Sequence, residues 1–265
     1  MSRVEGRFED DIAVVTGSTR GIGEGIARRL AAEGATVVVT GRTRADGEAV
    51  ATALRERGGD ATFLEADVRE EADIERLFER TVERHGRVDV LVNNAGVQTE
   101  TSVTDLSAEE WDRVLETDFR SFWLCASHAA EHMPDGASIV NVSSNHAFVT
   151  MPNLFPYNAV KAGINGMTRA MALDLGPTIR VNTVNPGWIA VERTVGDMSD
   201  ERRRRLESIH PVGRIGTPED VAAVVSFLAS EEAGFVTGTA VTVDGGRTAV
   251  MQDDSLPDYA DPDEE

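Results

Sequence analysis

Short apolar runs alternate along the chain with longer segments in which apolar residues recur at helical spacing. The apolar runs contain little of the polar alternation that marks a half-exposed strand, so they are typical of strands buried on both faces of a parallel sheet. The expected strands cover residues 12–16, 36–40, 62–66, 90–92, 138–143, 179–184 and 240–243. The expected helices cover residues 21–33, 45–57, 70–85, 108–132, 156–175 and 218–230.

Strands that alternate with helices in this way predict an α/β fold with one doubly wound, Rossmann-type sheet. No linker divides the chain, so we expect a single dinucleotide-binding and catalytic domain over residues 1–265. Residues 188–211 are polar and interrupt the alternation, which indicates a substrate lid. Residues 252–265 are acidic and contain two prolines, which indicates a loose C-terminal tail or a flap ordered in an oligomer.

Composition and charge exclude several classes of partner and site. A formal net charge of −20 makes nucleic acid an unsuitable partner, because its phosphates would be repelled. Many acidic residues, with arginine in place of lysine, suggest a protein of a high-salt cytoplasm; the alternative is an acidic protein from a GC-rich genome. The single cysteine, Cys125, excludes an internal disulfide, and we expect no metal site. The sequence shows no signal peptide and no apolar run long enough to cross a membrane, so we expect a soluble, cytoplasmic protein.

Lys161 is the only lysine in the chain, and it follows Tyr157 by four positions. Residues at this spacing share one face of a helix, about 6 Å apart, so the ammonium and the phenol can act at one site. Ser144 follows the expected strand at 138–143, where open α/β sheets bind their ligands. These three residues are candidates for a catalytic set. The alternative is a solvated lysine and a packed tyrosine on an ordinary amphipathic helix.

A glycine-rich turn, TGSTRGIG, follows the first expected strand at residues 16–23. Glycines let a backbone turn sharply and approach a pyrophosphate, whose charge the helix N-terminus stabilises. A turn of this kind is weak evidence by itself and also occurs as a purely structural feature. Its position between a strand and a helix favours a dinucleotide site.

Together these motifs resemble the short-chain dehydrogenase/reductase family. The resemblance rests on TGSTRGIG, on NNAG at residues 93–96, on Ser144 and the YxxxK pair, on NPG at 185–187, and on the segment from 213 to 246. It extends from about residue 12 to residue 246. It implies a seven-stranded doubly wound domain that binds NAD or NADP, acts on a small molecule and assembles as a homotetramer or homodimer.

The resemblance also implies roles for individual residues. Tyr157 would be the acid/base, Lys161 would stabilise its phenolate and hold the nicotinamide ribose, and Ser144 would orient the substrate oxygen. The implied cofactor-binding residues are Gly17, Thr19, Arg20, Gly21, Ile22, Gly23, Arg42, Thr43, Asp67, Val68, Asn94, Ala95, Gly96, Tyr157, Lys161, Pro186, Gly187 and Ile189. The substrate-binding candidates are Ser144, His146, Tyr157 and Trp188.

Charge at the end of the second strand favours NADP(H) over NAD(H). A carboxylate there would bond the ribose hydroxyls and repel a 2′-phosphate, but the position holds Gly41, followed by Arg42 and Thr43. Arg20 could reach the same phosphate, and the arginine fork suits phosphate geometry. The alternative is that both arginines are solvated surface charges.

The sequence departs from the family at two positions. Asp118 stands where the family has an asparagine that completes a proton relay to the lysine, and the extra charge would alter the surroundings of Lys161. Val191 stands where the family has a threonine that contacts the carboxamide; Thr194 could replace it only if the loop shifts. Both departures leave Ser144, Tyr157 and Lys161 in place.

The sequence therefore predicts hydride transfer between NADP(H) and a secondary alcohol or ketone. Polar and aromatic residues mixed in the pocket loops favour a sugar, a polyol or a small hydroxy or oxo acid. A 3-oxoacyl thioester reductase is the alternative within the same class. A sensor or scaffold that binds a dinucleotide without turnover is the alternative of another class.

Overall fold

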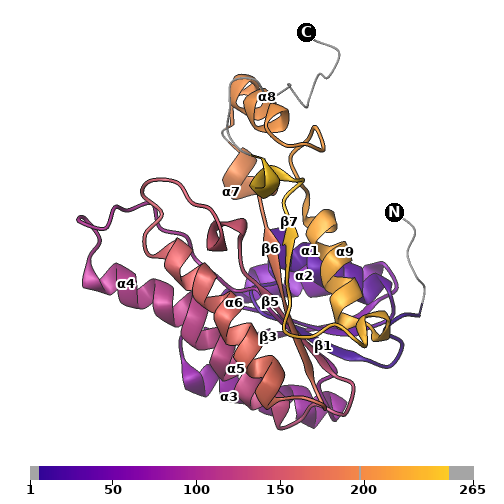
Figure 1. Ribbon diagram of the computed structural model, residues 1–265. Helices are drawn as coiled ribbons and strands as arrows, with labels where there is room; N and C mark the ends of the chain where they lie inside the picture. Colours follow the sequence, from indigo (N-terminus) through magenta and orange to yellow (C-terminus); the bar gives the residue numbers. More distant parts are fainter. Residues whose placement is uncertain (1–5, 197, 251–265) are drawn as a thin grey trace.

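A parallel sheet of seven strands forms the centre of the computed structural model, which describes residues 6–196 and 198–250 (Figure 1). The strand order is β3-β2-β1-β4-β5-β6-β7. The strands are β1 (Ile12–Val15), β2 (Thr36–Gly41), β3 (Asp60–Glu65), β4 (Val90–Asn93), β5 (Ser138–Val142), β6 (Arg180–Pro186) and β7 (Ala240–Val243). Each expected strand is present, and the bounds differ from the expected ones by a few residues at most.

Helices cover both faces of the sheet, as the uninterrupted apolar runs predict (Figure 1). One face carries α1 (Gly21–Ala32), α2 (Arg44–Glu56) and α9 (Pro218–Ala229). The other face carries α3 (Glu71–His85), α5 (Ser121–Ala130) and α6 (Tyr157–Asp174). Neighbouring residues of β1 point to opposite faces, so Val15 joins the first core and Val14 the second.

The strand order reverses between β1 and β4. Strands that follow β1 in sequence build outward through β2 and β3, whereas β4 returns to pair with β1 on its other side. The loops after β1 and β4 therefore diverge at the carboxyl edge of the sheet. Open α/β sheets bind ligands in the crevice that forms at this point.

Two segments differ from the simple expectation. The helix expected over 108–132 consists of α4 (Ala108–Leu115), a π-helical turn (Glu116–Arg120) and α5. The segment over 188–211 contains the helices α7 (Glu192–Val195) and α8 (Asp200–Ser208), which stand above the carboxyl ends of β6 and β7 (Figure 1).

The acidic segment 252–265 lies outside the described residues. In the part of the chain that the structure describes, none of the helices has the length and apolar character to cross a membrane.

Candidate active site

Ser144, Tyr157 and Lys161 meet at the carboxyl end of β5. The strand ends at Val142, and Ser144 follows in extended conformation with its side chain buried. Tyr157 begins α6, and Lys161 lies one turn further along. A hydrogen bond of 2.8 Å from the Ser143 hydroxyl to the Lys161 carbonyl ties the end of the strand to this turn of the helix. The three candidate residues are thereby held on one side of the crevice.

Lys161 is almost completely buried, with 4% of its surface exposed. Its ammonium donates to the Val142 carbonyl over 3.4 Å and lies 5.4 Å from the centre of the Tyr157 ring. The ring of Phe122 covers it from α5 at 5.5 Å. The one lysine of the chain is thus a buried charge beside the phenol, and the solvated lysine of the alternative interpretation is wrong.

Asp118 supplies the counter-charge. Its Oδ2 lies 3.0 Å from Nζ of Lys161, and its side chain is fully buried within the π-helical turn. Its Oδ1 accepts a 2.7 Å hydrogen bond from the backbone amide of Val97. A Cβ at Gly96 would lie only 2.8 Å from Oδ2, so a glycine is required for this close approach.

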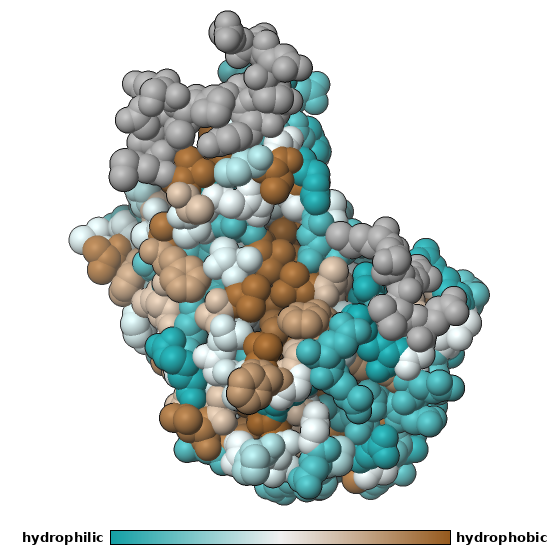
Figure 2. Space-filling model, turned by 45° about the vertical axis from the view of Figure 1, so that its right-hand side comes forward, coloured by the Kyte–Doolittle hydropathy of each residue, from teal (hydrophilic) through white to brown (hydrophobic). Residues whose placement is uncertain are grey.

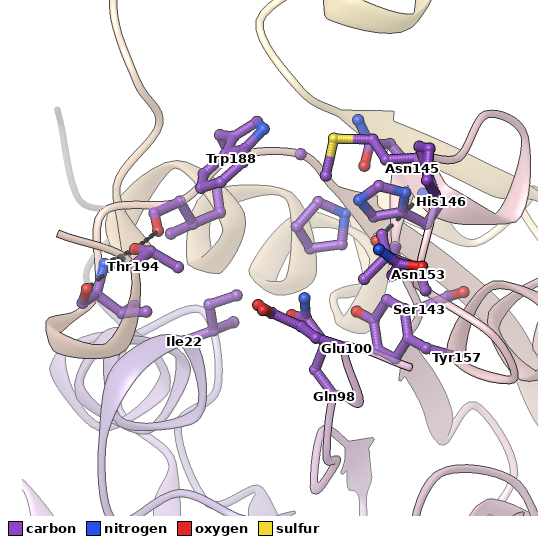
Figure 3. A pocket seen from close by; sticks show the side chains of 18 of the residues that line it. Ile22, Gln98, Glu100, Ser143, Asn145, His146, Asn153, Tyr157, Trp188 and Thr194 are labelled. Carbon is purple, nitrogen blue, oxygen red and sulfur yellow. Dashed lines mark hydrogen bonds between the residues drawn. The ribbon is translucent and has the colours of Figure 1, made fainter. Parts of the chain in front are cut away.

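A cavity of about 380 Å³ opens in front of Ser144 and Tyr157. Tyr157, His146 and Asn153 lie on one side of it, and Trp188, Thr194 and Ile22 lie on the other (Figure 3). Its lining is Ile22, Gln98, Glu100, Ser143, Ser144, Asn145, His146, Met151, Pro152, Asn153, Leu154, Tyr157, Pro186, Gly187, Trp188, Ile189, Val191, Thr194 and Arg202. Ile22 belongs to the glycine-rich turn, so this turn and the tyrosine border one space.

His146 borders the cavity beside the phenol. Its backbone amide donates to the Ser144 hydroxyl over 3.2 Å, and its ring meets the Tyr157 ring edge to face with centroids 6.1 Å apart. Burial lowers the pKa of His146, because a charged imidazolium would lose hydration there. The imidazole is therefore neutral at physiological pH and can exchange hydrogen bonds with a substrate.

The glycine-rich turn fits a dinucleotide pyrophosphate. Gly17 adopts φ +62°, and a Cβ there would lie 2.8 Å from the Cα of Ala95, so the turn packs tightly on the loop after β4. Asn94 braces it by donating from Nδ2 to the carbonyls of Thr16 and Gly17. Arg20 caps α1 in extended conformation without a side-chain hydrogen bond. The first-turn amides of α1 thus point to the crevice without a capping side chain, which suits an anion.

The expected adenosine side lies at the ends of β2 and β3. Gly41 packs against Thr19, whose Cγ2 would lie 2.7 Å from a Cβ at that position. Arg42 is exposed at the end of β2. The Asp67 carboxylate is held by Arg69 at 2.6 Å, and this hydrogen bond keeps the pKa of Asp67 below its usual value. Asp67 is therefore ionised, and its backbone amide donates to Asp73.

The loop after β6 places Gly187 and Ile189 on the cavity and leaves no room for a side chain at Gly187, where a Cβ would contact Asp244. Thr194 also lines the cavity, although its hydroxyl donates to the Ile189 carbonyl over 2.6 Å. The Val191 amide donates back to the same hydroxyl over 3.0 Å. Thr194, in the first turn of α7, is thus hydrogen-bonded to the segment that is expected to hold the carboxamide.

Sequence reasoning missed several residues of the cavity. Gln98 and Glu100 line the cavity from the segment after β4. Their position after the carboxyl end of a strand could have identified them as candidate cavity residues. Asn153 and Met151 belong to the irregular loop before α6, where no local pattern indicates direction. Arg202 comes from α8, and its guanidinium lies 6.0 Å from the centre of the Trp188 ring. Whether Arg202 lines the cavity depends on how α8 packs over the sheet, which the sequence pattern does not indicate.

Comparison with known proteins agrees with this geometry. A family model described as enoyl-(acyl carrier protein) reductase matches residues 17–248. The chain is 40% identical over 247 residues to cis-4-hydroxycyclohexanecarboxylate dehydrogenase of Sinomonas cyclohexanicum, covering 92% of this chain and 98% of the relative. It is 37% identical over 242 residues to glucose 1-dehydrogenase 2 of Bacillus subtilis, covering 89% and 94%.

Solved structures show the same fold. A short-chain dehydrogenase/reductase from Serratia marcescens is 36% identical and superposes with a TM-score of 0.87, over 91% of this chain and 99% of that one. The matched family model covers the glycine-rich turn from Gly17 onward and also the tyrosine–lysine pair. The chain belongs to the short-chain dehydrogenase/reductase family and is an NAD(P)-dependent oxidoreductase.

Proposed function

We propose that the protein interconverts a secondary alcohol and a ketone, with Tyr157 as acid/base, Ser144 as the group that orients the reacting oxygen and Lys161 as the charge beside the phenol. One observation carries this proposal: Ser144 and Tyr157 share a wall of the cavity, and buried Lys161 lies 5.4 Å from the phenol ring. A bound nicotinamide supplies hydride to the carbonyl carbon or accepts it from the alcohol.

The residues of the chain handle the proton. In reduction, negative charge develops on the substrate oxygen, the Ser144 hydroxyl donates a hydrogen bond to it, and Tyr157 delivers its proton. In oxidation, the same phenol receives the proton of the alcohol. The loop 186–189 and the glycine-rich turn would hold the dinucleotide against this wall, and Lys161 would contact its nicotinamide ribose.

A Tyr157→Phe substitution tests the proposal and separates it from the sensor or scaffold alternative. We expect turnover to fall by about 10²-fold or more, because the proton donor is lost, while dinucleotide affinity measured by fluorescence stays within about twofold. For a sensor or scaffold, the substitution should change neither turnover, which would be absent in both proteins, nor dinucleotide affinity. Equal turnover by Tyr157→Phe and the parent would exclude the proposed role of the tyrosine.

For the substrate we favour a hydroxylated ring compound or a small hydroxy or oxo acid. The cavity presents Gln98, Asn145, His146 and Asn153, which can bond hydroxyl groups. Arg202 adds a cation that can bind a carboxylate. The two named relatives act on a hydroxycyclohexanecarboxylate and on glucose, both of which carry a secondary alcohol on a ring.

Rates measured over a panel of sugars, polyols and cyclic hydroxy acids would test this class. Within the panel, Arg202→Gln should raise KM for acids at least tenfold and leave KM for neutral sugars nearly unchanged. A 3-oxoacyl thioester reductase is the second candidate. The matching family model is described as an enoyl-(acyl carrier protein) reductase, which shares an acyl thioester substrate with this candidate but reduces a carbon–carbon double bond. Faster turnover of 3-oxoacyl thioesters than of every ring alcohol would identify the protein as a 3-oxoacyl thioester reductase.

We also propose NADP(H) as the preferred cofactor. Gly41 stands at the position of the acidic residue that would favour NAD(H), Arg42 follows it, and Arg20 belongs to the glycine-rich turn.

For the assembly we propose a homotetramer or homodimer. Strand β7 is an edge strand, and apolar side chains gather in a strip on the face that contains it (Figure 2). Exposed Phe227 and Phe235, at and after the end of α9, add to the apolar surface. Light scattering after size exclusion measures the assembly.

A further inference from the structure

A buried ion pair stands directly behind the candidate catalytic tyrosine. The Lys161 and Asp118 side chains are 5% and 0% exposed, and their charged atoms are 3.0 Å apart. Burying two charges is costly, and the pair is retained only with good geometry and further hydrogen bonds. Asp118 has such a bond from the Val97 amide. The charge of Lys161 is therefore opposed by a fixed carboxylate at the place where it acts on Tyr157.

Besides this pair, the cavity that Tyr157 lines contains two charged side chains among the described residues, Glu100 and Arg202, whose charges are opposite. Tyr157 and Lys161 come from α6, and the Phe122 ring from α5 covers the ammonium. The turn Asn145–Ala147 contributes His146, whose imidazole is neutral. The segment after β4 contributes a neutral backbone amide. The ammonium of Lys161 and the carboxylate of Asp118 are the buried charges beside the phenol.

We propose that Asp118 is a positioning residue that offsets the charge of Lys161 at Tyr157, weakens the stabilisation of a phenolate there, and thereby extends the pH range over which the phenol can donate its proton in carbonyl reduction. The inference rests on the proposed function, because it assigns the proton to Tyr157. A lysine alone would stabilise the phenolate, which is the form that accepts the proton of the alcohol, down to lower pH. A lysine paired with a carboxylate stabilises the phenolate less.

The reduction balances without a further reactant. The O–H bond of Tyr157 breaks, its proton goes to the carbonyl oxygen, and the carbonyl carbon gains hydride from the reduced dinucleotide. Tyr157 is left as a phenolate and regains its proton from solvent. Asp118 keeps its charge throughout and acts only through Lys161.

The size of the effect follows from the distances. The carboxylate oxygen lies 3.0 Å from the ammonium, which is itself 5.4 Å from the ring centre, so the carboxylate is at most about 8 Å from that centre. Unit charges roughly 8 Å apart shift each other's ionisation by roughly one pH unit at effective dielectric constants of about 20–40. Removing the carboxylate should therefore move ionisation of the phenol down by roughly one pH unit.

The chain allows this ionisation to be measured without turnover. Tyr157 and Tyr259 are its only tyrosines, so a Tyr259→Phe background leaves one phenol, whose near-ultraviolet phenolate absorbance can be titrated. In that background, Asp118→Asn keeps the side-chain shape and the acceptor for Val97. We expect its titration midpoint to lie roughly one pH unit lower than in the background protein. An unchanged or higher midpoint would overturn the inference.

A second pair of variants covers the case in which Asp118→Asn does not fold. Lys161→Met combined with Asp118→Asn removes both charges and leaves no buried ion without a partner, whereas Lys161→Met alone leaves the carboxylate. The double variant should titrate at a lower pH than the single variant. Equal midpoints would contradict the role of Asp118.

Glu33→Gln is the matched control. Glu33 is also a fully buried carboxylate, paired with Arg29 at 2.6 Å, but it lies at the end of α1 away from the cavity. This variant should lose stability and leave the Tyr157 titration unchanged. The pH profile of kcat/KM for alcohol oxidation should follow the titration, moving to lower pH in Asp118→Asn. If no substrate turns over, the proposed function fails, while the absorbance titration still decides the role of Asp118.

Discussion

The hydroxyl of Ser143 donates a hydrogen bond of 2.8 Å to the carbonyl oxygen of Lys161, joining the end of β5 to the second turn of α6. Ser144 continues from one partner, and Tyr157 precedes the other by one helical turn. The relative position of the two proposed catalytic groups therefore depends on a contact made by their neighbours. Proton transfer requires such fixed geometry.

Ser143→Ala should reduce activity more than stability. Loss of one buried hydrogen bond lowers the free energy of unfolding by about 1 kcal/mol, measured by urea denaturation. We expect kcat to fall about tenfold, because β5 and α6 can then shift relative to each other. Ser138→Ala is the matched control, since Ser138 lies in β5 and its hydroxyl donates to Leu228 over 3.2 Å far from the cavity. A similar loss of kcat in both variants would contradict a specific role for Ser143.

Arg42→Asp should exchange the cofactor preference. The introduced carboxylate would repel a 2′-phosphate and accept hydrogen bonds from ribose hydroxyls. We expect kcat/KM for NADP⁺ to fall at least tenfold relative to that for NAD⁺, measured in parallel assays with one substrate. Arg57→Asp makes the same charge change at the far end of α2 and should leave the ratio unchanged. An unaltered ratio in Arg42→Asp would mean that Arg42 is only a surface charge.

Asp11→Asn should stabilise the protein at neutral pH. Burial and the nearby Asp89 raise the pKa of Asp11 from 3.8 to about 6. The folded state therefore binds this proton more tightly than the unfolded state. The contribution of Asp11 to stability is highest below about pH 4, falls as the pH rises to about 6, and stays reduced at pH 7.

Asparagine lacks the charge that is disfavoured. We expect a gain of about 1 kcal/mol at pH 7, below the full linkage value because the carboxyl is only partly buried, and little difference at pH 4. Denaturation curves at both pH values measure this. Asp10→Asn changes an exposed neighbouring carboxylate by the same charge and provides the comparison. A gain of equal size at pH 4 would contradict the assignment to Asp11.

Stability should fall on dilution from molar to millimolar salt. With a net charge of −20, repulsion among surface carboxylates opposes the folded state unless ions screen it. We propose on this basis that the protein is adapted to high salt. Melting temperatures measured over a potassium chloride series should rise with concentration and level off above molar salt. A melting temperature independent of salt would contradict adaptation to high salt.

The sequence by itself determined the class of the fold and the location of the main candidate residues. Apolar runs without polar alternation must be buried on both faces, so alternation with helices already required a parallel doubly wound sheet. The four-residue interval from Tyr157 to Lys161 placed both on one helical face, and the glycines after β1 indicated the dinucleotide turn. These are local patterns, and local geometry translates them directly into structure.

Only the tertiary structure decided what surrounds those residues. The family resemblance suggested that Asp118 lies near Lys161, but no periodicity in the sequence records a direct ion pair. The structure forms that pair between a π-helical turn and α6. Glu100 and Arg202 meet at one cavity because separate loops converge over the carboxyl edge of the sheet. Such contacts join segments far apart in the chain and depend on how whole elements pack. The candidate catalytic residues could thus be read from the chain, whereas the charge balance that we propose to govern them emerged from the packing of α6 against the π-helical turn.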